Sequence, residues 1–213
     1  MTTAVGSNAS SLVDVGDFSI AYRAVGAGPT VVFLHGCPFA SFVWRDVMAG
    51  LAGRFRCVAP DLLGLGDTET PDGADWSLGA QAQMVIGFLD RLGIDRAHIV
   101  GHDYGGAVAQ LLAANLADAD RRAKTKRFLA GQLDPDHNKV TLDLVDGLRR
   151  FDHRTLLLWA VNDAHFGPAW ADRLRADLAG PVEVRLLDDT GHLLMEERPG
   201  AYAQHVAAFL TAP

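Results

Sequence analysis

The chain has 213 residues, a formal net charge of -7 at pH 7, and 49% hydrophobic against 21% charged residues. This length predicts one domain with a sizeable core, and the acidic balance argues against a nucleic-acid or anionic-membrane partner. No apolar run is long enough to span a bilayer, and the first eleven residues lack the apolar stretch of a signal peptide. Two cysteines, Cys37 and Cys57, are too few for a disulfide framework, so we expect a cytoplasmic protein.

The first half of the chain alternates strand and helix patterns. A hairpin is predicted around Gly16-Asp17, and the continuous apolar run at 30–34 predicts a strand buried on both faces. The helix that follows should turn Phe42, Val43, Val47 and Leu51 inward. In chain order the predicted elements are strands at 12–15, 18–23 and 30–34, a helix at 41–52, a strand at 55–59, a helix at 78–92 capped by Ser77, and a strand at 97–100.

After the next helix, which begins by Ala107, this alternation stops. No strand is predicted from 117 to 150, where two helical stretches cover about 121–133 and 138–151. A strand at 155–161, a helix at 168–178, a strand at 182–187 and a helix at 199–210 close the chain. The pattern predicts an α/β fold, a mostly parallel twisted sheet flanked by helices behind an N-terminal antiparallel hairpin. We expect a single domain over 1–213, with about 119–150 as a connector.

The stretch Gly101-His102-Asp103-Tyr104-Gly105-Gly106 joins a predicted strand to a predicted helix. Its form, glycine, any residue, nucleophile, any residue, glycine, is typical of a nucleophile elbow. The turn is so tight that a side chain at either flanking glycine would collide with backbone. Its central residue is Asp103, where a serine is more usual. We interpret His102 as a packed residue of the turn.

Three polar residues follow three predicted strands: Asp103, Asp163 and His192. Ligands bind at the carboxyl edge of such a sheet, and the order nucleophile, acid, histidine is that of a hydrolase triad. His35-Gly36-Cys37-Pro38 follows the strand at 30–34. The backbone N–H of Cys37 could pair with that of Tyr104 to form an oxyanion hole.

These motifs resemble the α/β-hydrolase superfamily, and more narrowly its aspartate-nucleophile branch of epoxide hydrolases and haloalkane dehalogenases. The resemblance covers 12–116 and 134–211, with matching motifs at 35–38, 61–67, 101–106, 159–163, 191–192 and 196–199. Such relatives carry a further strand and a helical lid between the nucleophile and the acid, whereas this chain has little room for them. The lid was deleted, or the sequence omits residues of a longer chain, or the chain is a degenerate relative. Because a sheet strand is missing together with the lid, we favour the second explanation, that the sequence omits residues of a longer chain.

The resemblance and the residue chemistry predict the same roles. A carboxylate is ionised at neutral pH, so Asp103 needs no base to attack a carbon that bears a good leaving group. His192 then activates the water that hydrolyses the resulting ester, and Asp163 orients His192. The amides of Cys37 and Tyr104 hold the oxyanion. No metal or organic cofactor is implied, since the remaining histidines show no ligand spacing.

The leaving group separates three hypotheses. Dehalogenases resemble one another in binding halide through a Trp after the nucleophile and a polar residue between Gly and Pro, where this chain has Tyr104 and Cys37. Because a thiol is a weak donor, we rank an epoxide hydrolase first and a haloalkane dehalogenase second. Epoxide hydrolases use lid tyrosines, however, and none of Tyr22, Tyr104 and Tyr202 lies in a lid segment. A non-catalytic ligand-binding protein on the same fold is the third hypothesis.

The partner predicted by all three hypotheses is a small molecule, and the chain could be a monomer or a homodimer. Four residues near the motifs are candidates to line its pocket, although a core position is equally compatible with each: His35, Phe39, Trp44 and Phe166.

Overall fold

A computed structural model describes residues 10–116 and 139–212 of the chain. It begins with an antiparallel hairpin of β1 (Ser11–Val15) and β2 (Phe18–Val25), in which Val13 faces Ile20. Gly16 makes the turn with a φ of 61°, a conformation that glycine adopts without steric cost. The predicted hairpin is therefore confirmed.

Five strands form the larger sheet, in the order β1-β2-β4-β3-β5. β3 (Thr30–Leu34) lies between β4 (Arg56–Pro60) and β5 (His98–Gly101) and is parallel to both. β2 joins β4 in antiparallel pairing, which makes the sheet mixed. The four residues from Val31 to Leu34 have no exposed surface, as expected for a strand covered on both faces.

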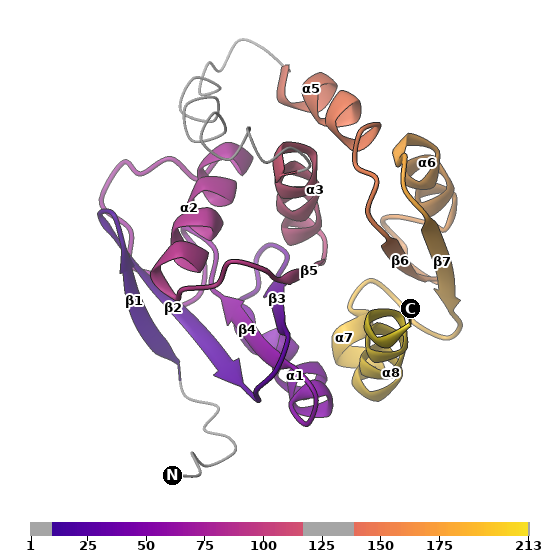
Figure 1. The fold of residues 1–213 in the computed structure, drawn as a ribbon, viewed down its shortest axis with the longest axis horizontal. Coiled ribbons are helices and arrows are strands. Elements are labelled where there is room, and N and C mark those ends of the chain that lie inside the picture. Colours follow the sequence, from indigo (N-terminus) through magenta and orange to yellow (C-terminus); the bar gives the residue numbers. More distant parts are fainter. Residues whose placement is uncertain (1–9, 117–138, 213) are drawn as a thin grey trace.

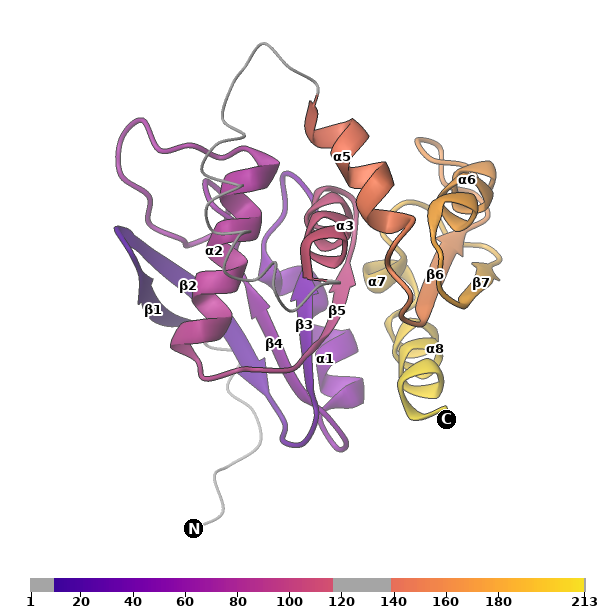
Figure 2. The same cartoon turned by 45° about the horizontal axis from the view of Figure 1, so that its top comes forward.

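Helices cover both faces of this sheet (Figures 1 and 2). Side chains of β3 alternate between two hydrophobic clusters, because successive residues of a strand point to opposite faces. Val32 and Leu34 pack with α2 (Leu78–Arg91) and α3 (Tyr104–Leu116). Val31 and Phe33 pack with α1 (Arg45–Leu51), with the short 3-10 helix η1 (Ser41–Trp44) that precedes it, and with α8 (Pro199–Thr211).

One predicted inward residue is wrong. Phe42 is 49% exposed, and the guanidinium carbons of Arg23 and Arg45 lie 5.3 and 4.2 Å from the centroid of its ring. Cation–π contacts of this kind retain an aromatic ring at the surface without burying it. The helical pattern alone could not distinguish this arrangement from a core position.

The second half of the chain forms a separate, two-stranded parallel sheet of β6 (Thr155–Ala160) and β7 (Val182–Leu187). α5 (Lys139–Leu148) precedes it, α6 (Ala169–Asp177) joins its two strands, and the unpredicted α7 (Leu194–Glu197) leads into α8. The predicted helix at 121–133 lies outside the described residues. Within the described part, no ladder joins β5 to β6, so the expected sheet is divided where the resemblance implies a further strand.

Helix packing and an ion pair are among the contacts that hold the two parts of the divided sheet together. α8 packs on α1, and the Cβ of Ala203 lies 3.1 Å from where a Cβ on Gly50 would stand. Arg45 donates two hydrogen bonds to the carboxylate of Glu196, at 2.5 and 2.9 Å. Such bidentate pairs combine energy with a defined geometry.

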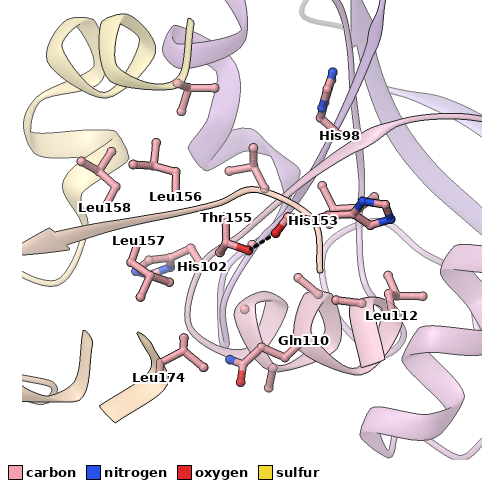
Figure 3. Close-up of a pocket in the computed structure, with 18 of the residues that line it drawn as sticks. His98, His102, Gln110, Leu112, His153, Thr155, Leu156, Leu157, Leu158 and Leu174 are labelled. Carbon is pink, nitrogen blue, oxygen red and sulfur yellow. Dashed lines mark hydrogen bonds between the residues drawn. The ribbon is translucent and has the colours of Figure 1, made fainter. Parts of the chain in front are cut away.

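A cavity of about 2030 Å³ lies between β5 and β6. Figure 3 shows His98 and His102 on the β5 side and residues 156–158 of β6 lining it. Among the described residues, no helix is long and apolar enough to cross a membrane.

Candidate active site

Asp103 lies in a strained turn between β5 and α3. Its φ of 52° is in the left-handed region, which costs a non-glycine residue about 1–3 kcal/mol. A Cβ on Gly101 would lie 2.4 Å from the carbonyl oxygen of Gly105, and one on Gly105 would lie 2.3 Å from that of Leu34. Both glycines are therefore required by close backbone approach, as predicted for the elbow.

The two carboxylate oxygens of Asp103 have different surroundings. Oδ1 accepts a hydrogen bond from the backbone N–H of Cys37 at 3.2 Å. Oδ2 lies 3.5 Å from Nε2 of His192. One oxygen is thus held by a backbone donor while the other faces the imidazole ring.

His192 is oriented by Asp163. Its Nδ1 lies 2.9 Å from Oδ2 of Asp163, and Oδ1 of Asp163 accepts hydrogen bonds from the amides of His165 and Phe166 at 2.8 and 3.0 Å. Burial alone would raise the pKa of Asp163, but the hydrogen bond from His192 and these two amides outweigh it and lower that pKa below its ordinary value of 3.8. Asp163 is therefore ionised at neutral pH and can hold Nδ1–H of His192.

This lowered pKa predicts how Asp163 affects acid stability. A depressed native pKa stabilises the fold above the unfolded pKa, and this contribution is lost as the pH falls through the native value. Between about pH 5 and pH 3, the free energy of unfolding should therefore fall less steeply in Asp163→Asn than in the unchanged protein. Urea denaturation at a series of pH values measures both slopes, and parallel slopes would contradict the prediction.

The hydroxyl group of Tyr104 is held by a backbone carbonyl group. The phenol donates a hydrogen bond to the backbone carbonyl of Trp76 at 2.6 Å, and burial raises its pKa. Leaving-group stabilisation by the Tyr104 hydroxyl would require this bond to break.

The four pocket candidates separate into core and cavity positions. Trp44 is fully buried against Phe33 and Tyr202, so it takes the core position that the sequence left equally open. His35 is also fully buried: its Nδ1 bonds the Gly36 carbonyl and its Nε2 accepts from the Leu62 amide.

His35 is a neutral structural residue rather than a pocket residue. Burial lowers its pKa, and both of its ring nitrogens are occupied by backbone hydrogen bonds. Phe39 packs against the hydrophobic core from a partly buried position. Phe166, which also packs near the ring of His192, lines the cavity between β5 and β6.

Two contacts at the site were not predicted. Nε2 of His102 lies 2.7 Å from the backbone carbonyl oxygen of His192, and the two rings are 4.7 Å apart. The Glu197 carboxylate accepts the Gly191 amide at 2.7 Å, beside His192. The contact of His102 with His192 joins residues 90 positions apart, so no local sequence pattern predicts it. The contact of Glu197 with Gly191 joins two motifs that are neighbours in the sequence.

Residues 29–124 match the protein-family model described as the alpha/beta hydrolase fold. A haloalkane dehalogenase of Bradyrhizobium elkani superposes with a TM-score of 0.76 at 23% identity, covering 96% of this chain and 99% of that one. A membrane phospholipase A superposes with a TM-score of 0.78 at 24% identity, over 95% and 85% of the two chains. The chain is therefore an α/β-hydrolase-fold protein, as the sequence predicted.

Two of the matched sequences carry the names of enzymes. Haloalkane dehalogenase 2 of Mycobacterium tuberculosis is 41% identical over 102 residues, which are 48% of this chain and 36% of that protein. The soluble epoxide hydrolase of a Corynebacterium species is 36% identical over 108 residues, or 51% and 37% of the two chains. The chain thus spans little more than a third of the length of these curated relatives.

Proposed function

We propose that this chain is a hydrolase that forms a covalent ester on Asp103. The observation that carries the proposal is the separation of its two carboxylate oxygens, one on the Cys37 amide and one facing His192. A general base would not need this arrangement. A nucleophile whose own carbonyl carbon is later attacked does need it.

In the first step, Oδ2 of Asp103 attacks a saturated substrate carbon. A new C–O bond forms as the bond to the leaving group breaks and its electron pair departs with that group. In the second step, Nε2 of His192 takes a proton from water, whose oxygen attacks Cγ of Asp103. Charge develops on Oδ1, beside the Cys37 N–H. Collapse breaks the Cγ–Oδ2 bond, the departing alkoxide takes the proton from His192, and the new carboxylic acid loses its proton to water, which restores the carboxylate.

An epoxide is the substrate class that we place first. A halide needs directed donors, and the Tyr104 hydroxyl is bonded to Trp76 while the Cys37 thiol is a weak donor. Ring strain helps to expel an epoxide oxygen, and the alkoxide can be protonated from water. Haloalkanes are the second candidate class, because a relative matched over about half of this chain is named a haloalkane dehalogenase.

The test is to trap the ester in the variant His192→Gln. Without an imidazole base, ester formation should continue while hydrolysis stops, so intact mass spectrometry should show a stoichiometric adduct. Styrene oxide and 1,2-epoxyhexane add their whole mass, whereas 1-bromobutane and 1-chlorohexane add only the alkyl group in place of a proton. The adduct mass therefore identifies the substrate class.

The matched control is the double variant Asp103→Asn, His192→Gln, which should remain unlabelled. Peptide mapping should place the adduct on Asp103. Absence of label from every compound, together with ligand-induced thermal stabilisation of the unchanged protein, would favour the ligand-binding hypothesis instead.

A further inference from the structure

We propose that His102 is a positioning residue, which holds the loop of His192 against the elbow across the divided sheet. The inference rests on the proposed function for its kinetic consequence. Its structural basis is a contact between the two halves of the molecule.

The nucleophile and its base belong to different sheets. Asp103 follows β5 of the five-stranded sheet, whereas Asp163 and His192 follow β6 and β7 of the two-stranded one. In the part of the chain that the structure describes, no strand ladder joins these sheets. The 3.5 Å separation of Asp103 and His192 must therefore be maintained by other contacts.

His102 provides such a contact beside the reacting groups. Its backbone N–H donates to the Leu34 carbonyl at 3.0 Å, which fixes the residue to β3. Its ring then reaches the other half of the molecule, where Nε2 lies 2.7 Å from the His192 carbonyl oxygen. Figure 3 shows this ring at the wall of the cavity between the two sheets.

The chemistry of the pair assigns the proton. A carbonyl oxygen only accepts, so Nε2 of His102 must carry the hydrogen. Burial lowers the pKa of His102 and favours the neutral ring. A neutral ring with its single hydrogen on Nε2 satisfies the carbonyl and places no second positive charge beside His192 when that ring takes up a proton.

The test compares His102→Phe, which keeps a ring but removes the donor, with His102→Gln, whose amide can donate to the same carbonyl. Because His192 acts on the water, its displacement should slow ester hydrolysis by about 10–100-fold in His102→Phe while ester formation is unchanged. Rapid-quench mass spectrometry measures both rates, and His102→Gln should recover most of the hydrolysis rate. Equal rates in His102→Phe and the unchanged protein would overturn the proposal, as would failure of Gln to rescue.

A second measurement needs no substrate. Hydrogen exchange at residues 188–195 should be faster in His102→Phe and unchanged in His102→Gln. The matched control is His98→Gln, because His98 belongs to β5 and its side chain lines the same cavity. If His192→Gln traps no ester, the proposed function fails, whereas unaltered exchange in His102→Phe would separately overturn the positioning role.

Discussion

Asp103→Asn is expected to lower turnover by at least about 10⁴-fold while leaving the fold intact. The amide oxygen carries no negative charge and cannot displace a leaving group from a saturated carbon. Its size and shape match those of the carboxylate, so the Cys37 amide keeps an acceptor. Asparagine also tolerates the left-handed backbone at φ 52° better than most residues.

The matched control for this substitution is Asp189→Asn. Asp189 has a φ of 54°, nearly the same as that of Asp103, but its side chain is exposed and lies near Arg198. This variant should retain the turnover of the unchanged protein. Product formation from the substrate that labels Asp103 gives both rates, with intact mass excluding deamidation of the introduced asparagine. Turnover within tenfold of the unchanged protein in Asp103→Asn would contradict an ester mechanism.

Gly105→Ala is expected to destabilise the fold by about 3 kcal/mol or more. A Cβ there would lie 2.3 Å from the Leu34 carbonyl oxygen and 2.5 Å from that of His35. Both atoms belong to backbone at the end of the buried strand β3, so neither can move without disturbing that strand. The elbow must therefore open or the strand must shift, and either change displaces Asp103.

Gly106→Ala, one residue further along α3, tests this explanation. Its nearest neighbour to an added Cβ is 3.7 Å away, an ordinary van der Waals contact. Alanine is the better helix former by about 1 kcal/mol, so this variant should be neutral or slightly stabilised. Urea denaturation measures both variants. Equal destabilisation of the two variants would show that close approach to β3 does not explain the cost of Gly105→Ala.

Local sequence patterns predicted much of the fold because their physical causes are local. The alternation around Gly16 specified a hairpin, and the apolar run of β3 specified a strand covered on both faces. The two glycines of the elbow predicted a turn that excludes a Cβ. α7 was missed because a four-residue helix has no periodic signal of its own.

The order of Asp103, Asp163 and His192, each after a strand, was sufficient to predict that they lie near one another. Parallel strands of one sheet bring their carboxyl ends to a common edge. The structure places the three side chains at 3.5 and 2.9 Å even though the sheet is divided. Their catalytic roles remain the proposal that the trapping experiment tests.

Only the tertiary structure decided which polar and aromatic groups face the site. Trp44 and His35 lie in the core, Phe42 contacts two arginines at the surface, and the Tyr104 hydroxyl donates to the Trp76 carbonyl. Each outcome depends on a partner distant in the sequence, so no local pattern could specify it. By itself the sequence determined the strands, the elbow and the order of the reactive groups. The division of the sheet, and the contact of His102 across it, arise from long-range packing between the two halves of the chain.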